Sequence, residues 1–343
     1  MVKEEKPLFI AEIGVNHEGD LDTAKALILA AKKAGADVAK FQSYKKDLIA
    51  APHSPSYWDL SSEKTESQYE LFGKYDSFGV DEYRELAAYC LSHEIEFMTT
   101  FFDIEAVKEL GDLVSRFKVA SADITNFQLL REIALANKPI ILSTGAASMF
   151  EIANALTFLS KVNNNLEISL LHCVLNYPTD ISNAQLGRIA ELKVKYPTHT
   201  IGYSDHTKPV DSKIALIAAY SLGARIFEKH FTLDKDLPGN DHYHSFDYED
   251  LQEMIKKFEN LAKALRFEEQ YFLDSQSLAR ENARRGLYLK RDMNAGDIVT
   301  EEDLMPLRPT VLNGVNAQDF YNIVGKMLKN DKLKLSPLLN CDV

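Results

Sequence analysis

Two histidines in this sequence have the surroundings of metal ligands. His206 and His230 end the seventh and eighth of a series of short apolar runs. Imidazole is a common ligand of divalent metals, and two imidazoles at adjacent strand ends can share one ion. Glu228 precedes His230 by two residues, so a strand would turn both side chains to one face. A single histidine is more often structural, but the Ser-Asp-His and Glu-Lys-His contexts favour a metal site in which Glu228 binds the ion or its water.

Two lysines point to an anion site. Lys40 and Lys118 each interrupt an apolar run, and Gln42 shares the face of Lys40 by strand alternation. An unpaired buried charge is very costly, so both ammonium groups need anionic partners. Those partners are either carboxylates of the protein, such as Glu12, or a bound ligand. Hydroxyl groups at the ends of other runs would suit a small dianion together with the lysines: Thr100, Ser121, Ser143 and Ser204.

The elements that must position these side chains are eight short apolar runs in the first 230 residues, separated by segments with helical patterning. Strands commonly end at polar loops, but this does not explain why Lys, Glu and His recur inside the runs. In a parallel (β/α)8 barrel the strand C-termini converge on one face, where chemistry collects. Helical spacing predicts helices at residues 21–34, 127–136, 150–159, 185–195, 212–222 and 248–265.

The alternation of strands and helices predicts a parallel sheet with right-handed crossovers. Eight units in about 265 residues fit a (β/α)8 (TIM) barrel, which typically has about 250. A doubly wound open sheet is the alternative. No Gly-x-Gly-x-x-Gly motif follows any run, which disfavours dinucleotide binding.

Two segments depart from the alternation. Residues 50–80 contain Pro, Ser, Tyr and Trp and predict a long insertion that carries substrate contacts at the barrel mouth. Residues 267–285 are polar and predicted helical, and residues 286–343 show short strand and turn signals. We therefore predict a barrel domain at 1–270, a linker at 271–285 and a small β-rich domain at 286–343. The core of so short a domain is marginal, so we expect it to dock onto another surface.

Composition limits the classes of partner. The 343 residues carry a net charge of −12, which argues against nucleic acid or an anionic membrane as partner. Three scattered cysteines are too few for a disulfide framework and indicate a reducing compartment. The charged first six residues do not read as a signal peptide, and no apolar run is long enough to span a bilayer. We expect a cytoplasmic protein.

Several motifs match one known family in their order and spacing. They are Ala11–His17, Lys40–Gln42, Ser143–Gly145, Tyr177–Thr179, Gly202–Thr207 and Glu228–Thr232. Together they resemble the sialic acid synthase family over almost the whole chain. Members of that family condense phosphoenolpyruvate with an amino-sugar aldehyde to give a nine-carbon 2-keto acid. Gly286–Tyr288, Ala295-Gly296 and Arg308-Pro309 are similar to the antifreeze-protein-like (SAF) domain that these synthases carry.

The resemblance implies a role for each matched residue. His206 and His230 would hold Mn²⁺ or Mg²⁺, and Glu228 would orient a metal-bound water. Glu12 and Asp241 would hold the hydroxyls of the sugar aldehyde. Arg308, from the tail of a partner subunit, would reach its acyl side, which implies a domain-swapped homodimer. Tyr177 would lie beside phosphoenolpyruvate, and Gln42 is expected to contact a substrate. Phosphoenolpyruvate itself would be bound by Lys40, Thr100, Lys118, Ser121, Ser143 and Ser204.

The chain also departs from the family pattern. Asp123 stands where the family often has Glu, and we expect it to act in catalysis. Leu175 replaces a family Asn, so either Asn176 supplies that phosphate contact or the contact is lost.

His242, Tyr243 and His244 follow Asp241 in a segment that contacts sugar in the family. They predict an acceptor other than N-acetylmannosamine. A diacetamido-trideoxyhexose and a neutral or phosphorylated hexose stay open. Two other functions remain: a metal-dependent aldolase or isomerase, and a non-catalytic carbohydrate-binding relative.

Overall fold

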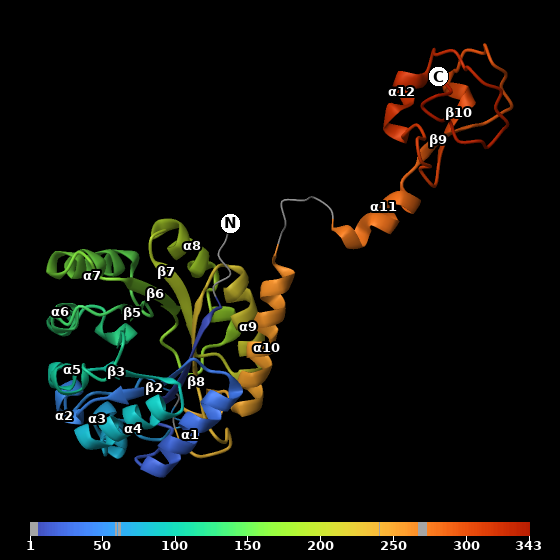
Figure 1. The fold of residues 1–343 in the computed structure, drawn as a ribbon. Helices are drawn as coiled ribbons and strands as arrows, with labels where there is room; N and C mark the ends of the chain where they lie inside the picture. The colour runs from blue at the N-terminus through green and yellow to red at the C-terminus, as the bar shows by residue number, and fades with distance from the viewer. Residues whose placement is uncertain (1–5, 59, 61–62, 240, 267–272) are drawn as a thin grey trace. The chain divides into compact units, whose positions relative to one another are not determined.

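The computed structural model describes residues 6–343 except 59, 61–62, 240 and 267–272. The chain forms two compact units that divide between Leu265 and Arg266. In the first unit, eight parallel strands pair in sequence order and β8 closes onto β1, so the sheet is a barrel rather than an open doubly wound sheet (Figure 1). The strands are β1 (Leu8–Gly14), β2 (Val38–Ser43), β3 (Glu96–Phe101), β4 (Phe117–Val119), β5 (Ile140–Ser143), β6 (Ile168–Cys173), β7 (Thr200–Asp205) and β8 (Ile226–His230).

Helices surround this barrel (Figure 1). All six predicted helices are present, with ends shifted by at most three residues: α1 (Leu21–Ala34), α6 (Phe127–Leu135), α7 (Met149–Val162), α8 (Gly187–Lys195), α9 (Pro209–Ser221) and α10 (Tyr248–Ala264). α1 ends at Gly35, whose φ of 104° favours glycine. The sequence does not predict α4 (Val80–Ser92) or α5 (Ile104–Leu110). α5 is too short for periodicity to reveal, and two of the three buried residues of α4 are Tyr and Cys.

Strand alternation divides the barrel residues between two environments. Outward side chains pack with the helices in the main core. Inward side chains from six strands form a separate apolar layer: Ile10, Val38, Met98, Ile141, Leu171 and Ile226. Two positions further along the same strands the inward residues are Glu12, Lys40, Thr100, Ser143, Cys173 and Glu228. The polar layer therefore lies directly above an apolar floor.

The predicted insertion, residues 50–80, follows the short helix α2 (Lys46–Ile49) and contains α3 (Gln68–Tyr75). The Ser67 side chain accepts a hydrogen bond from the Glu70 backbone N–H and so caps α3. The buried Trp58 indole donates to the carbonyl oxygen of Thr65 at 3.1 Å, which anchors the segment before α3. The segment is thus a folded part of the first unit.

The second unit contains an antiparallel pair, β9 (Gly286–Leu289) and β10 (Leu304–Leu307), around a small core of its own. α11 (Ser277–Ala283) lies in the predicted helical stretch, part of which falls outside the described residues. The β-rich tail domain is confirmed. In the part of the chain that is described, no helix has the length and apolarity needed to cross a membrane.

Candidate active site

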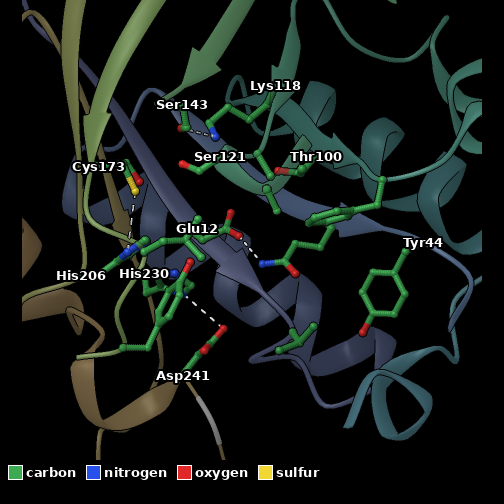
Figure 2. A pocket seen from close by; sticks show the side chains of 18 of the residues that line it. Glu12, Tyr44, Thr100, Lys118, Ser121, Ser143, Cys173, His206, His230 and Asp241 are labelled. Carbon is green, nitrogen blue, oxygen red and sulfur yellow. Dashed lines mark hydrogen bonds and ion pairs between the residues drawn. The ribbon is translucent and has the colours of Figure 1, made fainter. Parts of the chain in front are cut away.

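One pocket at the C-terminal ends of the strands gathers side chains from all eight of them (Figure 2). This is the face on which (β/α)8 barrels place their chemistry. The pocket brings together thirteen of the sequence-predicted residues: Glu12, Lys40, Gln42, Thr100, Lys118, Ser121, Ser143, Tyr177, Ser204, His206, Glu228, His230 and Asp241.

Three predicted residues do not line this pocket. Asp123 lies in a 3₁₀ turn after β4, where its carboxylate accepts a hydrogen bond from the Asn126 side chain and burial raises its pKa. Asn176 is exposed, and Leu175 lines the pocket beside it. Arg308 is an exposed residue of the second unit. The roles expected for these three therefore stay predictions.

Lys40 is held by carboxylates at the centre of the barrel. Its ammonium lies 2.6 Å from Glu12 Oε2 and 3.7 Å from Glu228 Oε2, and it donates to Thr100 Oγ1 at 2.9 Å. Burial alone would lower the pKa of Lys40, but the two carboxylates overcome it and raise the pKa above its usual value. Lys40 is therefore a permanent cation.

Lys118 is the less compensated of the two lysines. It donates to Ser143 Oγ at 2.8 Å, and its nearest carboxylate oxygen is Glu228 Oε1 at 3.6 Å. Burial lowers the pKa of Lys118; Glu228 opposes this shift and the charge of Lys40 adds to it. An arriving anion would compensate this ammonium group.

Glu228 connects the two lysines. It accepts a hydrogen bond from Ser204 Oγ at 2.9 Å. Burial would raise its pKa, but Lys118, Lys40 and the Ser204 hydroxyl lower the pKa of Glu228 to about 2. Two lysines therefore face two carboxylates, Glu12 and Glu228, so the array is close to neutral before any ligand binds. A multiply charged anion would need a further cation nearby.

The histidine pair lies beside this array. His206, just beyond β7, uses Nδ1 to donate to the Val174 carbonyl oxygen at 2.8 Å, which leaves Nε2 as a free lone pair. Burial and the nearby His230 lower the pKa of His206 to about 3, so the ring is neutral, as a metal ligand must be. The ring centres of His206 and His230 are 5.5 Å apart.

Asp241 adds a carboxylate to the pair. Its Oδ2 lies 3.3 Å from His230 Nδ1. Burial would raise the pKa of Asp241, but His230 lowers it to about 2. Potential ligand atoms of His230, Asp241 and His244 all lie within 4.8 Å of one another. The buried His230 Nδ1 and His244 Nε2 have no hydrogen-bond partner among the residues with described positions. Unpartnered imidazole nitrogens beside a carboxylate fit a divalent ion, and fit Mn²⁺ better than the oxygen-seeking Mg²⁺.

The outer part of the pocket is apolar and largely aromatic. Sequence reasoning expected substrate contacts from the insertion but did not single out these side chains or the buried Cys173. Among these residues, only the Tyr57-Trp58 pair in a polar segment gives a signal in the sequence. The residues of this outer part are Val15, Tyr44, Ile49, Tyr57, Trp58, Leu71, Phe72, Tyr75 and Phe102.

The segment 242–244 differs from its predicted position. All three residues lie outside the pocket lining. His242 is buried with Nδ1 2.7 Å from Thr232 Oγ1, and the Tyr243 hydroxyl donates to the backbone oxygen of Tyr177 at 3.1 Å. The expectation that these side chains contact the sugar directly is corrected: Tyr243 and His244 bond the backbone of Tyr177 and Asp241, which line the pocket, whereas His242 bonds Thr232 instead.

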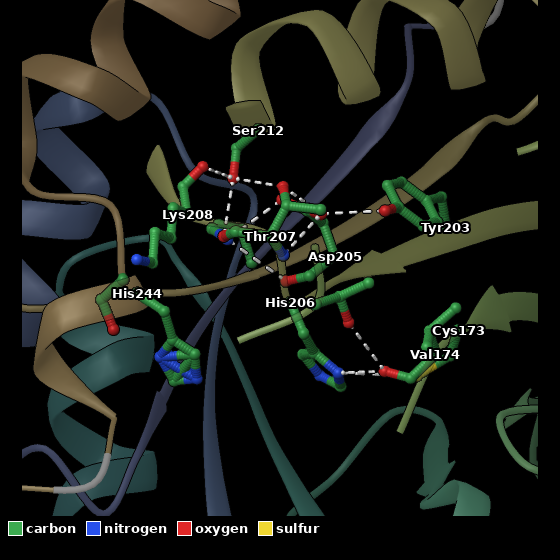
Figure 3. A network of polar contacts seen from close by, with 12 residues as sticks. Cys173, Val174, Tyr203, Asp205, His206, Thr207, Lys208, Ser212 and His244 are labelled. Carbon is green, nitrogen blue, oxygen red and sulfur yellow. Dashed lines mark hydrogen bonds and ion pairs between the residues drawn. The ribbon is translucent and has the colours of Figure 1, made fainter. Parts of the chain in front are cut away.

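A second buried ion pair fixes the strand end that carries His206. Lys229 points away from the lumen, and its ammonium lies 3.0 Å from Asp205 Oδ2 with both side chains fully buried. Asp205 also accepts hydrogen bonds from the Thr207 backbone N–H and hydroxyl, at 3.0 and 2.8 Å (Figure 3). Burial would raise the pKa of Asp205, but Lys229 and these donors lower it. Asp205 thus holds the chain on both sides of His206.

Replacing Lys229 with Met should lower the free energy of unfolding of the barrel by about 3–5 kcal/mol, because the Asp205 carboxylate would remain buried without its cation. Urea denaturation of the full chain, followed by circular dichroism, measures the loss. The matched control is Lys257→Met, which removes an exposed pair with Glu253 and should leave the midpoint nearly unchanged. Equal midpoints for both variants would contradict the structural role of Lys229.

Several known proteins are similar to this chain over most of its length. The N,N'-diacetyllegionaminic acid synthase of Campylobacter jejuni is 36% identical over 94% of this chain and 96% of its own length. The human N-acetylneuraminate-9-phosphate synthase is 32% identical over 93% and 88%. A crystal structure of a spore coat polysaccharide biosynthesis protein E from Chromobacterium violaceum superposes with a TM-score of 0.78 at 26% identity, covering 98% of this chain and 99% of that one. Because the NeuB family matches residues 27–270 and the SAF domain matches residues 284–343, the chain belongs to the NeuB family and carries a SAF domain.

Proposed function

We propose that this protein condenses phosphoenolpyruvate with a six-carbon amino-sugar aldehyde, releasing phosphate and a nine-carbon 2-keto-3-deoxy acid. The observation that carries this proposal is the placement of two buried lysines beside an imidazole–carboxylate cluster in one barrel pocket. The names of the relatives support it, since they are synthases of legionaminic, N-acetylneuraminic-9-phosphate and pseudaminic acids. A metal-dependent aldolase or isomerase would have no use for the paired lysines.

Phosphoenolpyruvate would lie deepest, in the polar layer above the apolar floor. Lys118 and Ser143 would donate to its phosphate, and Lys40 and Thr100 would donate to its other anionic oxygens. These donors are fixed by the barrel before the substrate arrives, so little reorganisation is needed as charge moves during the reaction. Ser121 and Gln42 would complete the donor set around the anion, and Ser204, whose hydroxyl donates to Glu228, would hold that carboxylate beside it.

The reaction forms one carbon–carbon bond and one carbon–oxygen bond, the latter from water, and breaks the carbon–oxygen bond to phosphate. C3 of phosphoenolpyruvate bonds to the aldehyde carbon, and the aldehyde oxygen takes up a proton. Water adds at C2, and the proton that it loses balances the one taken up by the aldehyde oxygen; Glu228, which the two lysines keep ionised, would orient this water by accepting its hydrogen bond. The C2–O bond to phosphate then breaks, and the C2 hydroxyl proton leaves with the phosphate, which gives the 2-keto acid.

A divalent ion, which we take to be Mn²⁺, would be held by His206, His230 and Asp241. It would polarise the aldehyde oxygen as a Lewis acid. It would also supply the positive charge that the Lys–Glu array lacks. The chain's own residues keep their roles around it: Tyr177, whose pKa burial raises well above 10, remains a protonated donor at the pocket wall.

The acceptor that fits the outer pocket is uncharged. Aromatic rings dominate this wall, and the cationic Lys and Arg side chains among the lining residues whose positions are described are Lys40 and Lys118 alone. Apolar ring faces suit deoxy carbons and the methyl groups of acyl substituents. We therefore propose a non-phosphorylated, acylated and deoxygenated hexose as acceptor.

Two further parts of the proposal concern the whole protein. The SAF tail would dock on the barrel of a partner subunit and present Arg308 to the acyl side of the sugar, giving a homodimer. Arg308 is exposed and belongs to a small domain with a core of its own, which is compatible with such docking. Residence in the cytoplasm is supported by the three scattered cysteines, which suit a reducing compartment.

Phosphate release from phosphoenolpyruvate across a sugar panel tests the function. With Mn²⁺ present, we expect release only with a hexose acceptor, and kcat/KM at least about tenfold higher for a diacetamido-trideoxyhexose than for N-acetylmannosamine or its 6-phosphate, since apolar contacts discriminate by 10–200-fold. Aldehyde-independent turnover, or turnover without phosphoenolpyruvate, would overturn the proposal. Preference for a phosphorylated sugar would refute the acceptor assignment alone.

A further inference from the structure

We propose that His244 is an additional protein ligand of the divalent ion, so that the ion is held by a third imidazole beyond the pair recognisable from the sequence. The inference deepens the proposed function and rests on its metal centre. His244 belongs to the short 3₁₀ turn His242–His244, which follows Asp241 after β8.

The first reason is an unused nitrogen in the interior. The His244 side chain is fully buried, and its Nδ1 donates to the Asp241 backbone oxygen at 2.8 Å. That bond assigns the lone pair to Nε2, which has no hydrogen-bond partner within the described parts of the chain. Leaving a buried polar atom without a partner is unfavourable, so the native protein should give this nitrogen a partner.

The second reason is where this nitrogen lies. His244 Nε2 is 3.9 Å from Asp241 Oδ1, and His230 Nδ1 is 3.3 Å from Asp241 Oδ2. Two ligands bound at about 2.1 Å to one ion are separated by roughly 3–4 Å, so both distances suit a shared ion and the longer one is too long for a hydrogen bond. The His230 and His244 rings are stacked with centres 4.8 Å apart.

The alternative partner for this nitrogen is a hydroxyl of the sugar. His244 does not line the pocket, whereas Asp241 and His230 do. A substrate hydroxyl would therefore meet those two side chains before it could reach Nε2. An ion between the three side chains meets no such obstacle, and it would also restrain the segment that carries Asp241.

Mn²⁺ affinity of the full-length protein tests this assignment without turnover. The chain is stripped with a chelator and titrated with Mn²⁺, and free Mn²⁺ is followed by electron paramagnetic resonance. We expect His244→Ala and His244→Phe each to weaken binding by at least about tenfold, as loss of a group supporting a metal site does. The Phe variant keeps the ring stacking, so it covers the case in which the Ala variant fails to fold.

His242→Ala is the matched control, because His242 is also a buried histidine of the same turn but bonds Thr232 instead. It should bind Mn²⁺ within about twofold of the native protein. Replacing the ion with Co²⁺ adds a second reading: the visible spectrum should change in the His244 variants and not in the control.

Two outcomes separate this inference from the proposed function. If the native protein binds Mn²⁺ and both His244 variants bind it equally well, the inference falls and the metal site stands without His244. If the native protein binds no Mn²⁺, the metal assignment of the proposed function fails and this inference fails with it, while phosphate release still decides whether the condensation occurs.

Discussion

Replacing Lys118 with Met should lower kcat/KM for phosphoenolpyruvate by about 10²–10³-fold or more, the range found when one preorganised donor to developing charge is removed. The side-chain volume is nearly kept, so the Ser143 and Glu228 neighbours lose a charge rather than a packing partner. Phosphate release measured at varied phosphoenolpyruvate, with the acceptor saturating, gives the value. Arg should not rescue activity, because its planar fork does not replace a point charge in this enclosed position.

The matched control for Lys118 is Lys161→Met on the exposed side of α7, which should retain native kinetics. Circular dichroism of both variants excludes unfolding as the cause of any loss. An unchanged kcat and KM in Lys118→Met would remove Lys118 from the anion site. It would also leave the lowering of the Lys118 pKa by burial without a functional explanation.

His206→Ala and Arg308→Ala should each be nearly inactive alone, yet regain activity when their subunits are mixed. His206→Ala removes a proposed metal ligand from the barrel, whereas Arg308→Ala alters only the tail. In a swapped homodimer, half of the randomly formed dimers are mixed and each holds one intact site, so equal mixing should restore about a quarter of native activity. The readout is Mn²⁺-dependent phosphate release after refolding or subunit exchange.

Native mass spectrometry of differently tagged chains establishes that mixed dimers have formed. If they form and activity does not return, the tail serves its own barrel or none. A chain that stays monomeric at assay concentration, with full activity, would refute the homodimer itself. Arg308→Lys is a useful companion variant, since partial activity would indicate that charge matters more than the bidentate fork.

The barrel and most of its inner surface follow from the sequence because strand periodicity is short and strict. Once Lys40 and Glu228 are placed on strands that end at one face, alternation brings them into the same lumen. The same rule turns Lys229 outward, toward Asp205. Residues on strands were therefore predictable as a group, although they lie far apart in the chain.

The parts that escape prediction depend on loops. The aromatic wall comes largely from the insertion, where no periodicity relates Tyr57 or Phe72 to the barrel axis. The contacts of the turn 242–244 are equally unpredictable from the sequence. Its histidines suggest polar contacts, but the partners, Thr232 for His242 and Asp241 for His244, are set by the fold. Long-range contacts made by loops are set by packing, which local sequence does not encode.

The apolar layer beneath Lys40 and Lys118 closes the lower end of the lumen, so the candidate active-site pocket opens only at its upper end. Whatever lies lowest must enter first and leave last. Phosphoenolpyruvate would bind before the sugar, which would then cover it. The phosphate ion would dissociate only after the nine-carbon product has left. The six apolar side chains of this floor therefore predict an ordered mechanism, in which the two substrates bind and the two products leave in a fixed sequence.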